Sequence, residues 1–284
     1  MSDAIVYLNG EFLPLDEAKI PVLDRGFIFG DGVYEVIPVF HGKAFRLEHH
    51  LQRLETNINA IKINNPQSKT GWASIINEVI SRNNPTDQSV YLQVTRGIAK
   101  RDHKFPHDIE PTVFVMSNPL TEVPESELEN GVTAITLDDI RWQYCNIKSI
   151  ALLPNILLRQ QAVEQNASEA ILIKDGKVTE GAASNIFTVK DSIIYTPSKA
   201  DCLLPGITRD LVLELASLHG MPCKEITISL NELQDADEIW LTSSTKEILP
   251  ITSLDNKKVG SGKPGETWKT MYHHYQDYKS GLSS

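Results

Sequence analysis

The sequence predicts an α+β fold with two domains, and three observations support this prediction. Short apolar strands are joined by tight turns, and helices with an apolar repeat lie among them. These elements do not alternate as strict βαβ units, which argues against a wholly parallel sheet. A Pro- and Glu-rich stretch, residues 119–131, lacks apolar periodicity and predicts a linker. We therefore expect a small N-terminal domain over 1–119, a linker over 120–131 and a larger domain over 132–284.

The N-terminal domain is expected to begin with a hairpin that turns at Asn9-Gly10, a dipeptide typical of two-residue turns. Two strands joined at His41-Gly42 follow, over 32–40 and 43–47. Leu47, Leu51, Leu54, Ile58 and Ile61 repeat with helical spacing and predict a helix over 47–61. The same reasoning predicts a second helix over 71–84 and strands over 89–99 and 112–118.

The C-terminal domain is expected to contain two further hairpins, over 169–181 with a turn at Asp175-Gly176 and over 185–197 with a turn at Lys190-Asp191. Residues 206–220 predict an amphipathic helix that ends at Gly220, a frequent helix-terminating residue. The remaining strands are expected over 132–140, 224–229 and 238–244, and the remaining helices over 155–167, 230–237 and 266–281.

The composition bounds the function. The chain has 284 residues, 41% of them hydrophobic and 23% charged, which is ordinary for a globular protein. A formal net charge of −10 argues against nucleic acid or an anionic membrane as the main partner. Anionic small molecules remain possible, because a local arginine pocket can sit inside an acidic surface. The start shows no signal peptide, and no apolar run is long enough to span a membrane. Three widely spaced cysteines favour the reducing cytoplasm over a disulfide framework, and no metal site is expected.

Lys148 heads an apolar stretch in "NIKSIALLPN", residues 146–155. A buried ammonium group is costly, so burial lowers the pKa of a lysine and makes its free amine available. A free amine can attack a carbonyl carbon. The alternative is a structural lysine whose charged end reaches solvent from the edge of a core segment, and from this stretch alone that alternative is the more common one.

Two polar clusters lie in the first half of the chain. "RGFIFGDGVYEV" leads into a strand that contains Tyr34, and its glycines indicate either a close approach to a ligand or, more often, a tight loop. In "TRGIAKRDHKFP", Arg101 and His103 lie two residues apart and face the same side of an extended backbone. Such a pair suits a carboxylate, although a solvated basic loop would give the same pattern.

Three more segments offer groups for an anion or a ring nitrogen. Glu180 follows a hairpin strand and precedes small residues, so its carboxylate could approach a ring nitrogen, or could be an ordinary surface group. "LPGITRD" predicts a helix start at which the amides of Ile207 and Thr208 can bind an anion. "LTSSTKE" offers Ser243 and Ser244 for a phosphate, and Ser244 with Glu247 also matches a helix capping box. Arg53 in "HLQRL" could add a cation to the same phosphate. Together these are the groups that pyridoxal phosphate chemistry requires.

The sequence resembles the fold-type-IV pyridoxal-phosphate aminotransferases. The segments "DRGFIFGDGVYEV", "HLQRL", "IKSIALLPNILLRQQA", "TEGAASNIF", "LPGITRD" and "TSSTKE" stand in the family's order between about residues 24 and 250. The resemblance implies a barrel-like β-structure in the larger domain, pyridoxal 5′-phosphate as cofactor, and a homodimer whose active sites are completed by a loop of the neighbouring subunit. "GDGVYEV" with "RDH" is most similar to the D-amino acid aminotransferases.

The resemblance also implies a role for each candidate residue. Lys148 would form the internal aldimine with the cofactor, and Glu180 would keep its pyridine nitrogen protonated. The residues expected to bind the cofactor's phosphate are Arg53, Ile207, Thr208, Ser243 and Ser244, and those expected to bind the substrate carboxylate are Tyr34, Arg101 and His103. The substrates would then be a D-amino acid such as D-alanine and a 2-oxo acid such as 2-oxoglutarate.

Three alternatives remain open at this level. A branched-chain L-amino acid aminotransferase would share the cofactor residues, but "YEVIP" stands where those enzymes typically show an arginine, as in "FEGIR". An aminodeoxychorismate lyase would release pyruvate without an amino acceptor, and "RDH" argues against it. A non-catalytic cofactor-binding protein on the same scaffold is disfavoured by the intact Lys148 and Glu180. "AAS" after Glu180-Gly181 is less rich in hydroxyl groups than the run in D-amino acid aminotransferases, which could alter cofactor affinity.

Overall fold

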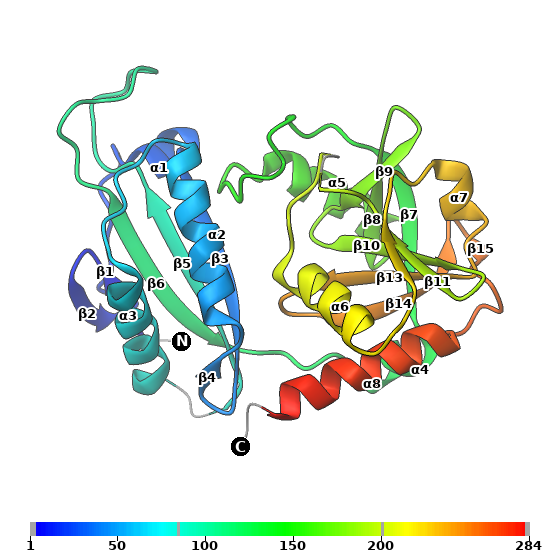
Figure 1. Ribbon diagram of the computed structural model, residues 1–284. Coiled ribbons are helices and arrows are strands. Elements are labelled where there is room, and N and C mark those ends of the chain that lie inside the picture. Colours follow the sequence, from blue (N-terminus) through cyan, green and yellow to red (C-terminus); the bar gives the residue numbers. More distant parts are fainter. Residues whose placement is uncertain (1–3, 84–85, 200–201, 282–284) are drawn as a thin grey trace. The chain divides into compact units, whose positions relative to one another are not determined.

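The computed structural model describes residues 4–83, 86–199 and 202–281, and the chain forms two compact units (Figure 1). The first unit contains the chain up to Thr121 together with residues 147–152, and the second contains residues 122–146 and the chain from Leu153 onward. The chain passes from one unit to the other between Thr121 and Glu122, which lie inside the expected linker. The domain boundaries 1–119 and 132–284 stay a prediction.

The first unit is built on a six-stranded antiparallel sheet with the order β2-β1-β6-β5-β3-β4 among the described residues (Figure 1). β3 and β5 pair along their whole lengths, from Gly32↔Thr95 to Val39↔Gln88. The strands are β1 (Ile5–Leu8), β2 (Glu11–Pro14), β3 (Gly32–Phe40), β4 (Lys43–Ala44), β5 (Gln88–Thr95) and β6 (Thr112–Pro119). The helices are α1 (Arg25–Phe29), α2 (Leu47–Ala60) and α3 (Lys69–Arg82).

The core of this unit lies between the sheet and the apolar faces of α2 and α3. Leu54 and Ile58 of α2 and Ile76 of α3 are completely buried, as are Val90 and Leu92 of β5. The alternation of apolar and polar residues along β5 directs every second side chain into this core. The predicted helices over 47–61 and 71–84 are thus observed within a few residues, and Asn84 lies outside the described residues.

The second unit is a curled sheet with the strand order β12-β11-β10-β13-β14-β7-β8-β9, and β15 pairs with β14. The pairs β7–β8, β7–β14 and β11–β12 are parallel and the others antiparallel. Its strands are β7 (Val132–Asp138), β8 (Glu169–Lys174), β9 (Lys177–Gly181), β10 (Asn185–Lys190), β11 (Ile193–Thr196), β12 (Cys223–Glu225), β13 (Glu238–Ser243), β14 (Glu247–Leu254) and β15 (Lys257–Lys258). Its helices are α4 (Glu125–Asn130), α5 (Leu153–Glu164), α6 (Ile207–Leu218), α7 (Leu230–Gln234) and α8 (Glu266–Ser280).

The prediction of an α+β fold with barrel-like β-structure in its C-terminal part is confirmed by this curled sheet and its helices (Figure 1). The inner strands β10 and β13 are buried on both faces, and Phe187 of β10 stacks on Trp240 of β13 within the core. No helix in the described part of the chain has both the length and the apolar composition that a membrane span requires.

Four local predictions were wrong or incomplete. The strand expected over 43–47 stops at Ala44, because Arg46 has a left-handed backbone (φ 51°) and begins α2. The β10–β11 turn consists of Asp191 and Ser192, both with positive φ, so Lys190 belongs to the strand. α4 lies within the expected linker. α1, β14 and β15 were not predicted, and Pro250 inside β14 argued against a central strand there.

Candidate active site

Lys148 lies in the segment 147–152, which adds to the start of β3 in the first unit. The Lys148 carbonyl accepts a hydrogen bond from the Tyr34 amide (3.0 Å), and the Ile150 amide donates to the Gly32 carbonyl (3.1 Å). These two bonds fix the backbone on either side of Ser149, which pairs with Val33. The side chain of Lys148 is half-buried, rather than buried as expected, and its Nζ lies 4.3 Å from the centroid of the Tyr34 ring. The ring therefore favours a cation or an amine at this position.

Beside this lysine, β3 and α2 form a buried ionic cluster. Glu35 is completely buried and accepts two hydrogen bonds from Arg53, from Nε (2.8 Å) and Nη2 (2.7 Å). The Nδ1 of His50, one turn earlier on α2, lies 2.7 Å from Oε2 of the same carboxylate, the oxygen that also accepts from Nη2 of Arg53. Two of the three guanidinium nitrogens of Arg53 are thus held by Glu35, which fixes the direction of the guanidinium plane.

The protonation states in this cluster follow from its charges. Burial alone would raise the pKa of Glu35, but the Arg53 guanidinium outweighs burial and lowers that pKa to about 2. Burial lowers the pKa of His50 below its ordinary value, and the charges of Arg53 and Lys148 lower it further, against the opposing effect of Glu35. At neutral pH the imidazole is therefore neutral, with Nδ1–H donating to an ionised Glu35.

Arg101 and His103 lie on an exposed loop after β5, and both side chains contact the ring of Phe29 at the end of α1. The Arg101 guanidinium carbon is 5.3 Å from that ring's centroid, and the imidazole centroid of His103 is 5.5 Å from it. The structure thus brings these two predicted residues together. Tyr34, the third predicted carboxylate-binding residue, instead contacts Lys148 and Tyr91.

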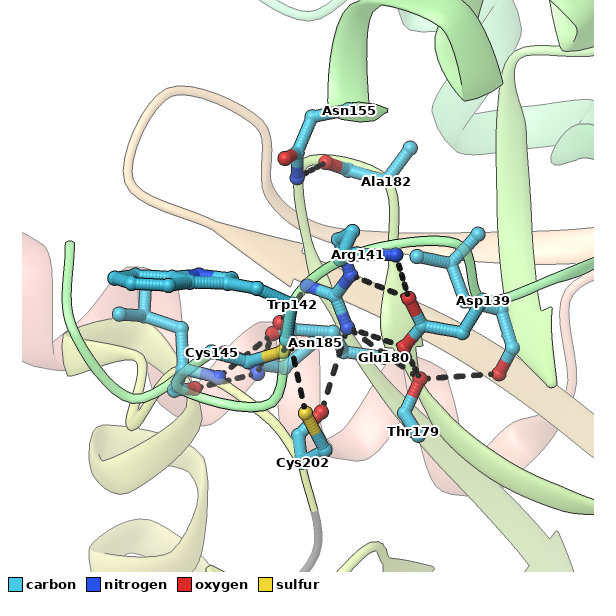
Figure 2. Close-up of polar contacts among 12 residues, drawn as sticks. Asp139, Arg141, Trp142, Cys145, Asn155, Thr179, Glu180, Ala182, Asn185 and Cys202 are labelled. Carbon is cyan, nitrogen blue, oxygen red and sulfur yellow. Dashed lines mark hydrogen bonds and ion pairs between the residues drawn. The ribbon is translucent and has the colours of Figure 1, made fainter. Parts of the chain in front are cut away.

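In the second unit, Glu180 stands near the end of β9 and is only 5% exposed (Figure 2). Its Oε1 is paired with Nη1 of Arg141, which lies on the loop after β7. Its Oε2 accepts hydrogen bonds from the Leu204 amide (3.0 Å) and from Nδ2 of Asn185 (3.1 Å). Glu180 is therefore a buried carboxylate in a fixed orientation and not a surface turn residue.

The pKa of Glu180 departs strongly from its ordinary value. Burial raises it to about 7, against the opposing effect of Arg141, and the nearby carboxylate of Asp139 contributes in the same direction as burial. A carboxyl group with a pKa near neutrality can exchange a proton with a bound ring nitrogen at physiological pH.

Asn185, at the start of β10, connects Glu180 to the two segments expected to bind phosphate. Besides its bond to Glu180, its Nδ2 donates to the Leu204 carbonyl at 2.8 Å. A Cβ atom placed on Gly206 would lie 2.0 Å from Oδ1 of Asn185, so the helix start approaches this side chain as only glycine permits. In the sheet, Asn185 is opposite Thr242, the residue before Ser243.

The first of these two segments is the start of α6. Ile207 and Thr208 form its first turn, and no side chain among the described residues caps it at Gly206. Both residues are buried, so their amides offer donors and a helix dipole within a sheltered site. This is the arrangement that binds phosphate groups at helix N-termini.

The second segment is the turn between β13 and β14, which contains Ser243 and Ser244. Oγ of Ser243 accepts a hydrogen bond from the Lys246 amide (3.1 Å), and Ser243 is opposite Glu247 across the hairpin. The capping box expected for Ser244 and Glu247 is wrong, because no helix begins here. A capping box is formed instead at the start of α7, where Ser229 and Glu232 bond each other's backbone amides.

The sequence did not reveal Glu35, His50, Arg141 and Asn185 as members of these clusters. Glu35 and Arg141 are hydrogen-bonded to predicted site residues distant in sequence, Arg53 and Glu180. Asn185 bonds Glu180 from five residues away, and His50 bonds Glu35. The sequence does contain one signal for such residues, namely a polar residue between apolar neighbours, as in "VYEVI". An apolar segment is expected to be buried, and a buried charge needs a partner.

Comparison with known proteins identifies the family. The family model of amino-transferase class IV matches residues 32–254. A D-alanine aminotransferase from Bacillus licheniformis is 42% identical over 266 residues, which are 94% of each chain. A D-alanine aminotransferase from Staphylococcus haemolyticus is 36% identical over 98% of this chain and 99% of its own.

Solved structures agree with this assignment. A branched-chain amino acid aminotransferase from Escherichia coli superposes with a TM-score of 0.91 at 26% identity, over 95% of this chain and 93% of that one. The T.th. branched-chain amino acid aminotransferase, solved with pyridoxamine 5′-phosphate, gives a TM-score of 0.91 at 25% identity, over 97% and 93%. The chain belongs to the class IV aminotransferases, and the assignment to the pyridoxal-phosphate-dependent aminotransferases made from the sequence motifs is confirmed.

Proposed function

We propose that the protein transfers an amino group between a D-amino acid, such as D-alanine, and a 2-oxo acid, such as 2-oxoglutarate. The observation that carries this proposal is the similarity to D-alanine aminotransferases at 36–42% identity across nearly the whole chain. The paired Arg101 and His103 support it, because a guanidinium beside an imidazole suits a substrate carboxylate.

The residues present fit pyridoxal 5′-phosphate. In the described part of the chain the Oε1 atom of Glu180 has one partner, Arg141, so the carboxylate retains an acceptor position for a protonated pyridine nitrogen. The start of α6 presents uncapped amides, and the glycine before it has no room for a side chain. The carboxylate suits the basic ring nitrogen of the cofactor, and the uncapped helix start close by suits its phosphate group.

The proposed roles are those that the resemblance to the aminotransferases implies. The cofactor, when bound, supplies an electron-accepting ring for the charge that develops at the substrate's Cα. Lys148 would hold the cofactor through its amine and would serve as the general base and acid for the proton at the substrate's Cα. Glu180 keeps the pyridine nitrogen protonated. The phosphate is bound by Arg53, Ser243, Ser244 and the amides of Ile207 and Thr208.

Tyr34, Arg101 and His103 are proposed to bind the substrate carboxylate, and the placement of that carboxylate decides which face of Cα meets the proton carrier. The loop that contains Arg101 and His103 is exposed. We propose a homodimer in which this loop completes the active site of the second copy. The protein is also proposed to act in the cytoplasm, in keeping with its three free cysteines.

A branched-chain L-amino acid aminotransferase is the second candidate, because the solved structures with high TM-scores include enzymes of that name. Their identity of 25–26% is lower than that of the D-alanine aminotransferases, which makes this candidate the weaker one.

A panel of amino donors tests the assignment. D-alanine and L-leucine, each offered with 2-oxoglutarate, should differ in kcat/KM by about 100-fold or more in favour of D-alanine, since misplacing the reacting hydrogen removes the alignment on which proton transfer depends. Turnover is followed by the 2-oxo acid released and by the absorbance change of the cofactor. Preference for L-leucine would establish the second candidate, and turnover of neither donor would contradict both.

Gly206→Ala should weaken cofactor binding. The added methyl group would meet Oδ1 of Asn185 at 2.0 Å, so Asn185 must move and its bond to Glu180 is strained. We expect the dissociation constant of pyridoxal 5′-phosphate to rise about tenfold, the equivalent of one lost hydrogen bond. Gly281→Ala is the matched control, because a methyl group there meets no described residue within 4 Å. Equal affinity in both variants would show that Asn185 does not support the site.

A further inference from the structure

We propose that Arg141 is a positioning residue that orients the carboxylate of Glu180 and keeps it ionised toward the cofactor's ring nitrogen. The inference rests on the proposed role of Glu180 and adds a residue to which no role has been assigned. It is carried by the buried cluster of Asp139, Arg141, Thr179 and Glu180, which joins the loop after β7 to β9 (Figure 2).

Arg141 is itself rigidly held. Its Nε donates to Oδ1 of Asp139 (2.9 Å) and its Nη2 to Oδ2 (2.8 Å), the two-point geometry that fixes a guanidinium plane. The Arg141 amide also donates to Oδ1 of Asp139 at 3.0 Å, and Thr179 Oγ1 donates to Oδ2 at 2.8 Å. With both ends of Asp139 fixed, Nη1 of Arg141 points at Oε1 of Glu180 (Figure 2).

The hydrogen bonds to Glu180 then define where a ligand can bind it. Oε2 is occupied by the Leu204 amide and Asn185, whereas among the described residues Oε1 is bonded by Arg141 alone. Each carboxylate oxygen accepts two hydrogen bonds, so the remaining position is on Oε1. Arg141 thereby fixes the rotation of the Glu180 carboxylate and the direction in which the remaining acceptor position of Oε1 points.

The charges of the cluster also support a cationic ligand at Oε1 of Glu180. When Glu180 is ionised, the two carboxylates and one guanidinium, all with side chains at most 6% exposed, have a net charge of −1. A buried net charge is costly unless it is compensated, and a protonated ring nitrogen would supply the missing positive charge. Arg141 lowers the pKa of Glu180 while Asp139 raises it, so the two residues act on the carboxylate in opposite directions.

The charged and titratable groups that the structure describes near this cluster come from few segments. Arg141 and Asp139 come from the loop after β7, and the thiols of Cys145 and Cys202 lie beside them (Figure 2). Burial raises the pKa of the Cys145 thiol well above its ordinary value, so this group stays neutral at the pH values of interest. Asn185 faces Glu180 from β10 and does not titrate.

The test is the pH dependence of pyridoxal 5′-phosphate binding to the cofactor-free protein, measured between pH 5.5 and 9.5 for four proteins. Relative to wild type, Arg141→Met should move the midpoint of the affinity profile up by about 1 to 3 pH units. Asp139→Asn should move it down, because the opposing carboxylate is lost. Thr179→Val disturbs the same cluster without changing its charge and should leave the midpoint in place. The cofactor's own ionisations are common to all four proteins and cancel in the comparison.

The outcomes separate this inference from the proposed function. If wild type neither binds the cofactor nor transaminates D-alanine, the proposed function fails and this inference fails with it. If wild type does both and the midpoints of Arg141→Met and Asp139→Asn coincide with its own, only this inference is overturned. A purely structural ion pair would lower the thermal stability of both variants without moving either midpoint. If Arg141→Met does not fold, the inference is tested with Arg141→Lys and Asp139→Asn instead. A midpoint for Asp139→Asn that is unchanged or higher than that of wild type overturns the inference.

Discussion

Replacing Lys148 with alanine should abolish the absorbance band of the lysine-bound cofactor and nearly all turnover. The loss of proton transfer alone is expected to reduce kcat by about 10²- to 10⁴-fold, and the loss of the covalent bond to the cofactor adds to it. The fold should survive, because the segment is attached to β3 through backbone bonds at Tyr34 and Ile150 that the side chain does not make. Removing the cation from the Tyr34 ring should cost about 0.5–1 kcal/mol of stability.

Two further variants test whether the loss of activity is due to the amine of Lys148 itself. Lys148→Arg keeps the positive charge over Tyr34 but cannot form the covalent bond, so it should be inactive as well. Lys174→Ala removes a half-buried lysine at the end of β8 and should keep full activity and the absorbance band. The measurements are the absorbance spectrum, kcat with D-alanine and 2-oxoglutarate, and thermal unfolding. An intact band or substantial turnover in Lys148→Ala would contradict the assignment of this lysine.

The fold was predictable where short-range signals decide the structure. Asn9-Gly10 and Asp175-Gly176 adopt the positive φ values of hairpin turns, as their composition indicates. The apolar repeat of residues 47–61 gave α2 to within one residue. The failures occurred where tertiary contacts override local preference. Pro250 lies in β14 between β13 and β7, and Arg46 adopts a left-handed conformation that no arginine prefers.

The candidate site residues could be found in the sequence as separate motifs, but the hydrogen bonds and ion pairs that connect them to other residues could not be predicted. Lys148, Glu180 and the helix start at Ile207 each belong to a contiguous segment that sequence alone can show. Arg141 is 39 residues from Glu180, and Glu35 is 18 residues from Arg53, so a single sequence offers no rule that pairs them. Burial also differed from expectation, because the lysine placed in an apolar segment is half-buried while Glu35 is completely buried.

Replacing Glu35 with alanine should be among the most destabilising single changes in the first unit. The substitution leaves the Arg53 guanidinium buried without its carboxylate, and breaking a buried ion pair in this way costs about 3–5 kcal/mol. The lowered pKa of Glu35 has the direction expected when the ionised carboxylate is stabilised in the folded protein. The free energy of unfolding is measured by urea titration of the cofactor-free protein, so that cofactor binding does not contribute.

Glu78→Ala is the matched control. Glu78 forms an equally short ion pair with Arg82 on α3 (2.7 Å), but both side chains are more than 40% exposed. Its removal should cost about 0.3–0.5 kcal/mol. Similar losses for the two variants would show that burial does not strengthen the Glu35 pair. Because Glu35 also fixes Arg53, Glu35→Ala should weaken cofactor binding, an effect that Glu78→Ala should lack.

The pH dependence of the free energy of unfolding should identify the ionisable groups that contribute to stability. Glu35 has a folded-state pKa below its unfolded value of 4.5, so its stabilising effect is complete above pH 4.5 and is lost as pH falls toward 2. His50 also has a lowered folded-state pKa, so its contribution is lost as pH falls below 6.5. Glu180 behaves in the opposite way, because its raised pKa makes the cofactor-free protein less stable as pH rises from 4.5 to about 7. Glu35→Gln should flatten the acid limb below pH 4.5 and, because Glu35 raises the pKa of His50, should also change the slope below pH 6.5. Glu180→Gln should remove the decline between pH 4.5 and 7. If Glu35→Gln left the acid limb unchanged, other carboxylates would have to account for it, and the buried Glu35–Arg53 pair would contribute little to the stability of the first unit.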